Sequence, residues 1–117
     1  MADSGTTVAQ LKDIVRDFVA ERAWERFHSP KNLAMGIAVE AAELMECFLW
    51  LDLPESYQAP KDAQKREAVA DEMADVLCYL LNLSNVLGID LSEALKAKMV
   101  KNAAKYPAER YRGKYEA

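Results

Sequence analysis

Glycine and proline are scarce in this chain of 117 residues, which contains four of each. Because both residues interrupt helices and shape the tight turns of β-rich folds, their scarcity favours long, uninterrupted helices. No apolar run approaches the roughly 18 residues that a membrane-spanning helix requires, so we expect no membrane partner. The first residues lack the basic and apolar regions of a signal peptide, and we therefore expect a cytoplasmic protein.

The chain also has few cysteines and lacks a net positive charge. The two cysteines, Cys47 and Cys78, are too few for a disulfide framework, and we expect both to be reduced residues of the core. The net charge of −4 argues against a nucleic-acid partner that is bound by phosphate neutralisation. The length is that of one domain, which we place at 1–117, with a core at about 7–106 and a basic tail at 107–117.

What the chain does contain is helical periodicity. Four segments carry apolar residues at helical spacing, namely about 7–27, 30–51, 62–87 and 90–106. Ser29 followed by Pro30 is typical of a helix start, and Gly88 of a helix end. The segment 52–60 contains two prolines and is expected to be a loop, and no strand pattern competes. The sequence therefore predicts an all-α fold, with a four-helix bundle-type protomer.

Two glutamates occupy unusual positions in the second and third of these segments. On a helical wheel of about 100° per residue, Glu40 and Glu72 each fall at the centre of their own apolar stripe. Each is followed three residues later by a second acid at the edge of the stripe, Glu43 and Asp75 respectively. An unpaired carboxylate in an apolar environment is costly, so a placement that occurs twice indicates a function.

These acids also match in register. In an antiparallel hairpin, facing residues have residue numbers with a constant sum, and Glu40 with Asp75 gives the same sum as Glu43 with Glu72. Four carboxylates would then meet at one height, where they repel one another unless protons or cations neutralise them. Oxygen ligands favour a hard cation such as Mg²⁺, with Mn²⁺ as a substitute. The alternative is that all four are exposed acids without a ligand.

The segments that hold these acids, "EAAE" and "DEMADV", resemble the ExxE…ExxD signature of the MazG-like nucleotide pyrophosphohydrolases. With "FHSPKNL" and "KMVKNAAKYP", the similarity extends over about residues 10–107 and is closest to the dCTP pyrophosphatase branch. The resemblance implies that water attacks the α-phosphate of a nucleoside triphosphate such as dCTP, giving a nucleoside monophosphate and pyrophosphate in nucleotide-pool house-cleaning. It implies one set of metal-binding and catalytic residues: Glu40, Glu43, Glu72 and Asp75.

A triphosphate also needs cations from the protein. One face of the fourth helical segment carries Lys98, Lys101, Asn102 and Lys105. Lysines near the end of a helix also complement its dipole, which is the alternative explanation. The resemblance implies that Lys98, Asn102 and Tyr106 bind phosphate or sugar.

A nucleobase needs flat partners. The resemblance implies that three aromatic residues surround it: Trp24, Trp50 and Tyr79. Val15 stands where some members of the family have a polar residue that contacts the base, which leaves the choice of nucleobase open. The single histidine, His28, is a candidate either for this pocket or for a structural contact.

Two other functions remain open from the residues. A di-metal carboxylate oxidoreductase would use two Glu-x-x-His pairs, whereas this chain has one, Glu25 with His28. A non-enzymatic helical interaction module would have no reason to centre acids on apolar stripes. A bundle this small, with aromatic residues at the stripe edges, should also cover its apolar surface by self-association. Similar proteins form homodimers or homotetramers, and we expect one of these.

Overall fold

The computed structural model describes residues 1–116, which fold into helices and contain no strand. The predicted all-α class is therefore confirmed. The chain divides into two compact units, the first from Met1 to Leu87 and the second from Gly88 onward. A single domain over 1–117 stays a prediction.

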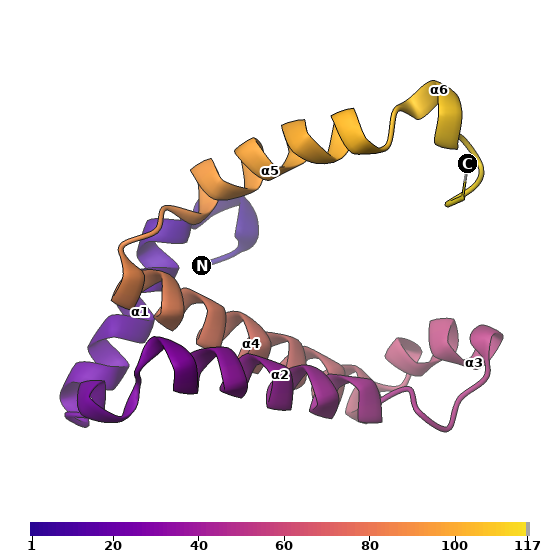
Figure 1. The fold of residues 1–117 in the computed structure, drawn as a ribbon. Coiled ribbons are helices and arrows are strands. Elements are labelled where there is room, and N and C mark those ends of the chain that lie inside the picture. Colours follow the sequence, from indigo (N-terminus) through magenta and orange to yellow (C-terminus); the bar gives the residue numbers. More distant parts are fainter. Residues whose placement is uncertain (117) are drawn as a thin grey trace. The chain divides into compact units, whose positions relative to one another are not determined.

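The first unit is built on two long helices that lie side by side. α2 (Pro30–Glu46) packs along α4 (Ala63–Leu87), and α4 returns beside α2 after the short α3 (Leu53–Gln58), as Figure 1 shows. α1 (Val8–Glu21) packs against α4 as well. Three 3₁₀ helices complete this unit: Asp3–Gly5, Glu25–Phe27 and Ala59–Lys61. The α2–α4 pair is the antiparallel hairpin that the register of the acids requires.

The core of this unit is small. Its buried apolar residues are Val15, Val19, Leu33, Ala59 and Leu81. Val15 and Val19 lie one turn apart on α1, where they form the apolar stripe that faces α4. Many large apolar side chains of the described residues remain exposed.

The predicted helix starts and stops at the centre of the unit are confirmed. The Ser29 hydroxyl accepts a hydrogen bond from the backbone N–H of Asn32 at 3.1 Å, and Pro30 is the first residue of α2. α4 ends at Leu87, and Gly88 has a φ of 66°, the left-handed conformation that favours glycine after a helix. These ends place α2 and α4 in the register that the acids need.

The end of the first helix was predicted wrongly. α1 stops at Glu21, not near residue 27, because Ala23 adopts a left-handed φ of 51°. The backbone N–H of Trp24 then donates to the carbonyl of Val19 at 3.1 Å, which satisfies a carbonyl in the last turn of the helix. This turn folds residues 24–28 back toward α1.

The next connection also differs from the prediction. α2 ends at Glu46, five residues before the end predicted at about residue 51. The segment 52–60, which was expected to be a loop, contains α3. The signal for α3 is present in the sequence: the Asp52 side chain accepts from the backbone N–H of Glu55 at 2.8 Å, and the Glu55 carboxylate accepts from the backbone N–H of Asp52 at 3.2 Å. This reciprocal pair is a capping box with aspartate at the cap.

The second unit contains α5 (Leu91–Lys105) and the short α6 (Ala108–Tyr111). The Asp90 carboxylate accepts from the backbone N–H of Glu93 at 2.8 Å, as the helix start at residue 90 predicts. Within the segment 107–117, which we expect to be a tail, α6 covers four residues, and the ring of Tyr111 packs edge-on against Tyr106 with centroids 5.2 Å apart.

By length and apolar composition, none of the helices in residues 1–116 could cross a membrane alone. α4 and α5 meet those two criteria only when they are taken together as an interrupted pair.

Candidate functional site

The four acids singled out in the sequence converge between α2 and α4. Each offers one carboxylate oxygen, and these oxygens all lie within 4.8 Å of one another. Glu40 and Glu43 lie one turn apart on α2, and Glu72 and Asp75 one turn apart on α4. The predicted register is therefore confirmed. We call these four residues the acidic cluster.

Two members of the acidic cluster are only partly exposed. Burial raises the pKa of Glu40 above its ordinary value, and a hydrogen bond to Glu43 and the negative charges of Glu43, Asp75 and Glu72 raise it further. Burial also raises the pKa of Glu72, followed by the charge of Glu43 and a hydrogen bond to it. The site therefore disfavours full ionisation of its own acids.

One oxygen on each of these glutamates lacks any partner. Oε2 of Glu40 and Oε2 of Glu72 are buried without a hydrogen bond. Buried polar atoms are almost always paired, so an orphaned pair in an acidic cluster calls for a ligand. A set of carboxylate oxygens at these separations fits a hard divalent cation, whose charge would relieve the repulsion. The donor set therefore suits a metal ion.

A small pocket of 110 Å³ lies beside the cluster on α4. Its lining combines aromatic and apolar side chains with one amide, and consists of Phe18, Val19, Trp24, His28, Cys78, Tyr79 and Asn82. The turn at Ala23 forms it, because it sets the Trp24 ring edge-on to Phe18, with centroids 5.8 Å apart, and 6.1 Å from the His28 ring. We call this the aromatic pocket.

Tyr79 is held in this pocket by a close approach to α2. A Cβ atom added at Gly36 would lie 2.3 Å from Cε1 of Tyr79, so only glycine leaves room for the ring. Tyr79 is one turn beyond Asp75 on the same helix. The contact between Gly36 and Tyr79 thus places one side chain of the aromatic pocket against the same pair of helices that carries the acids.

Cys78 connects the aromatic pocket to the acidic cluster. Burial raises the pKa of its thiol, and the charges of Asp75 and Glu40 raise it further, which shows that those carboxylates are near. Both cysteines are free, as expected. The expectation that both belong to the core is wrong: Cys78 is exposed and Cys47 is only half-buried, and neither is among the buried apolar residues.

The structure brings together some of the predicted substrate residues and not others. Trp24, His28 and Tyr79 share the aromatic pocket. Trp50 does not join them: its helix ends at Glu46, so its position on the helical wheel was wrong, and its side chain is 89% exposed.

The remaining predicted substrate residues belong to the second unit. Lys98 and Asn102 lie one turn apart on α5, and Tyr106 follows the helix, where its N–H donates to the Asn102 carbonyl at 2.8 Å. The side chain of Lys105 lies over the Tyr106 ring, 5.3 Å from its centroid. Their roles stay predictions.

Sequence reasoning missed four residues of the aromatic pocket: Phe18, Val19, Cys78 and Asn82. Phe18 belongs to the apolar pattern of α1 and carries no separate signal. Asn82 does carry one: it is a single amide in the run "LCYLLNL", three residues after Tyr79 and thus on the same face of the helix. A buried amide at such a position needs a partner, and the pattern could have been noticed.

The fold and the cluster together define a class of all-helical proteins that hold acids from two facing helices in one cluster. Residues 35–115 match the MazG-like family, and the chain belongs to that family.

Its relatives include curated enzymes and a solved structure. The chain is 34% identical over 110 residues to dCTP pyrophosphatase 1 of Bos taurus, covering 94% of this chain and 65% of that protein. It is 36% identical over 102 residues to dCTP pyrophosphatase 1 of Homo sapiens, covering 87% of this chain and 60% of that protein. The chain thus spans less than two thirds of the length of these relatives. A crystal structure of a pyrophosphatase from Archaeoglobus fulgidus DSM 4304 aligns with a TM-score of 0.81 and 41% identity, covering 92% of this chain and 98% of that one.

Proposed function

We propose that this protein is a Mg²⁺-dependent nucleoside triphosphate pyrophosphohydrolase that converts dCTP, or a closely similar nucleotide, to its monophosphate and pyrophosphate. The observation that carries the proposal is the acidic cluster with its two orphaned oxygens, next to a pocket lined by aromatic rings. The relatives named dCTP pyrophosphatase and the solved pyrophosphatase support the same reaction.

In this proposal the acidic cluster holds the ion. Glu40, Glu43, Glu72 and Asp75 supply carboxylate oxygens on the scale of one cation site. When bound, Mg²⁺ withdraws charge from the phosphate and lowers the pKa of attacking water, and Mn²⁺ would substitute. A carboxylate of the cluster that does not bind the ion accepts the proton of the water. The four acids are therefore both the metal-binding and the catalytic residues.

The base and the phosphates need separate groups. Trp24 and Tyr79 offer ring faces or edges to a base in the aromatic pocket, and His28 offers a ring nitrogen. Lys98, Asn102 and Tyr106 are proposed to bind phosphate or sugar, with the positive charge of Lys98 neutralising the β- and γ-phosphates, and Trp50 is proposed to lie against the base. These assignments follow from the resemblance of the sequence to the family.

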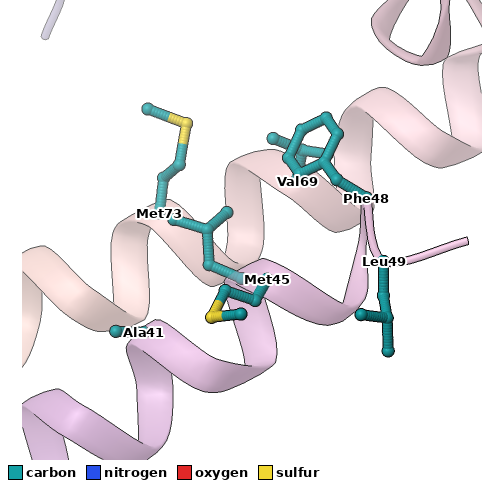
Figure 2. A pocket seen from close by; sticks show the side chains of 7 residues that line it. Ala41, Met45, Phe48, Leu49, Val69 and Met73 are labelled. Carbon is teal, nitrogen blue, oxygen red and sulfur yellow. The ribbon is translucent and has the colours of Figure 1, made fainter. Parts of the chain in front are cut away.

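We also propose that the active form is a cytoplasmic homodimer or homotetramer. An apolar groove of 570 Å³ opens on the first unit, lined by Ala41, Leu44, Met45, Phe48, Leu49, Val69 and Met73. Figure 2 shows Ala41 and Met45 on α2, Val69 and Met73 on α4, and Phe48 and Leu49 in the segment that follows α2. Met45 and Met73 are more than half exposed. An apolar surface of this kind marks an interface.

The decisive experiment is hydrolysis in ¹⁸O-labelled water. A panel of nucleoside triphosphates with Mg²⁺ is scored for pyrophosphate, and the products are read by mass spectrometry. Attack at the α-phosphorus places the label in the monophosphate. Label in free orthophosphate, with a diphosphate as the other product, would show attack at the γ-phosphate and would refute the proposed reaction.

Thermal unfolding separates the alternatives. Mg²⁺ or Mn²⁺ should stabilise the proposed enzyme, because an ion that binds only the folded state raises its stability, whereas an interaction module should not respond. The di-metal oxidoreductase is disfavoured by the donor set, since the cluster found in residues 1–116 holds no histidine.

A further inference from the structure

An amide is buried where the aromatic pocket meets α1. The side chain of Asn82, on α4, lines the pocket, and the residue is only 7% exposed. Its neighbours in the pocket are mostly apolar, and burying an amide among them is unfavourable unless its polar atoms are paired. Packing alone would be served better by leucine, which surrounds this position in the sequence.

His28 fixes the orientation of this amide. Nδ2 of Asn82 lies 2.9 Å from Nδ1 of His28. With Nδ2 of Asn82 as the donor, Nδ1 accepts and the proton of the neutral ring is on Nε2, whereas the other tautomer would instead donate from Nδ1 to the amide oxygen. His28 itself is held at the end of the 3₁₀ helix Glu25–Phe27, where its backbone N–H donates to the carbonyl of Glu25 at 3.1 Å.

With Nδ2 engaged, the acceptor end of the amide is left for a ligand. Within residues 1–116 the Oδ1 atom of Asn82 takes part in no hydrogen bond and, unlike Oε2 of Glu40 and of Glu72, it is not shut off from solvent. A carbonyl oxygen attracts an N–H group and repels another carbonyl oxygen. The pocket therefore presents a fixed acceptor next to aromatic rings.

We propose that Asn82 reads the edge of the nucleobase and selects an exocyclic amine, as in cytosine, over the carbonyl that uracil and thymine carry at the same ring position. His28 is the positioning residue that holds the amide in this orientation. This inference rests on the proposed function, since it assigns the base specificity of the same site.

The size of the pocket limits which amine-bearing base can enter. The aromatic pocket is small, at 110 Å³, which favours a single ring over a fused pair. Adenine also carries an amine but has two rings. The acceptor and the volume together favour cytosine.

The contact with His28 is what makes an amide selective. A free amide can turn over and exchange its oxygen and nitrogen, so it would serve an amine and a carbonyl equally well. Turning over here would set Oδ1 of Asn82 against the lone pair of Nδ1, unless the ring proton also moved from Nε2 to Nδ1. A fixed polar contact of this kind discriminates by about tenfold to a hundredfold.

The test measures the ratio of kcat/KM for dCTP to that for dUTP, with Mg²⁺, in the whole protein and in three variants. We expect a ratio of about ten or more for the unaltered protein. Asn82→Leu should bring the ratio close to one, mainly through loss of dCTP turnover. His28→Leu should lower the ratio in a different way, by a gain for dUTP, because the released amide can turn its nitrogen toward a carbonyl.

The matched control is Asn85→Leu. Asn85 lies one turn along on α4, outside the lining of the aromatic pocket, and donates to the Lys12 carbonyl at 3.0 Å. Its variant should keep the dCTP:dUTP ratio of the unaltered protein even if its stability falls. An unchanged ratio in Asn82→Leu, or a gain for dUTP in Asn85→Leu equal to that in His28→Leu, would overturn the inference.

Two further measurements keep the inference testable. If Asn82→Leu does not fold, Asn82→Asp replaces it: both carboxylate oxygens accept, so a preference for dCTP should survive, and a preference for dUTP would refute the assignment. If no triphosphate is hydrolysed, the proposed function has failed, and the inference is tested separately by thermal shift with dCMP and dUMP. Equal stabilisation by the two monophosphates would overturn it, and greater stabilisation by dCMP would support it.

Discussion

Glu40 and Glu72 lie in an environment that disfavours the ionised form of a carboxylate. Both have raised pKa values, first because of burial and then because of the surrounding acids, and each has one orphaned oxygen. Without a cation, such groups oppose folding at neutral pH. The same arrangement makes them good ligands, because a bound divalent ion neutralises the repulsion among the four carboxylates of the acidic cluster.

The metal-free protein should consequently lose stability as the pH rises. A raised pKa in the folded state means that the folded protein holds these protons more tightly than the unfolded chain. The free energy of unfolding then falls as the pH rises from the ordinary carboxyl pKa through the raised values. Thermal unfolding in a chelator, from about pH 5 to about pH 8, should show this slope, and Mg²⁺ should remove much of it.

The variants Glu40→Gln and Glu72→Gln should raise the metal-free melting temperature at neutral pH and reduce this slope. Both should nearly abolish triphosphate hydrolysis, because each removes a proposed metal ligand. Glu67→Gln is the matched control, since Glu67 is an exposed acid of α4 outside the cluster. A large drop in the metal-free melting temperature of both cluster variants would mean that these acids stabilise the fold through some other partner.

Gly36 is the other residue whose identity is set by the site. The change Gly36→Ala would gain about 1 kcal/mol of helix propensity. It would also press a methyl group against the Tyr79 ring, and overpacking of this kind costs about 1 to 3 kcal/mol. We therefore expect only a small net loss of stability, together with a clear displacement of Tyr79.

The displacement should appear as a higher KM for the triphosphate and a changed near-ultraviolet circular dichroism spectrum. Gly5→Ala is the control, because a Cβ at Gly5 meets nothing within 4 Å. An unchanged KM in Gly36→Ala, with a normal spectrum, would show that the Tyr79 ring is not part of the substrate pocket.

At the scale of the element, the turn after α1 decides whether the aromatic pocket exists. Ala23 holds a left-handed φ of 51°, which costs about 1 to 2 kcal/mol for a residue with a Cβ. The turn is retained because it carries Trp24 back to Phe18 and His28, with ring centroids 5.8 and 6.1 Å apart.

Replacing Ala23 with glycine should therefore stabilise the protein. Relief of the strain is partly offset by the greater freedom of glycine in the unfolded chain, which leaves a gain of about 0.5 to 1 kcal/mol. Ala70→Gly, at an exposed interior position of α4, should instead lose about 1 kcal/mol. Denaturant unfolding measures both, and a loss in Ala23→Gly as large as that in Ala70→Gly would show that residue 23 is helical in solution.

The same turn shows why some elements could be predicted and others not. The acids of α2 and α4 were found because their pattern is periodic and local, and the hairpin register followed from it. The bend at Ala23 could not be found, because alanine is the best helix former and only the packing of Trp24 justifies the bend. α3 was missed although Asp52 and Glu55 signal it, since the two nearby prolines suggested a loop. Trp50 was misplaced as a consequence, because a helical wheel has no meaning beyond the end of its helix.

At the scale of the whole molecule, the described residues bury few apolar side chains and leave many exposed. Five apolar residues are buried, and of these only Leu33 is fully so, whereas exposed apolar residues occur on every long helix. α5 buries none of its fifteen residues. Helices of this kind gain most of their stability from tertiary packing, so a second copy of the chain is the natural source of the missing contacts.

The last prediction follows from the apolar groove between α2 and α4. Met45 lies in the groove and is 65% exposed, so Met45→Lys would place a charge in the proposed interface without disturbing the core. Analytical ultracentrifugation at micromolar concentration should show a dimer or tetramer for the unaltered protein and a shift toward smaller species for this variant. Gln64→Lys, which adds the same charge at an exposed position of α4 outside the groove, should assemble normally. A monomeric unaltered protein would refute the assembly, and an unaltered assembly in Met45→Lys would place the interface elsewhere on the chain.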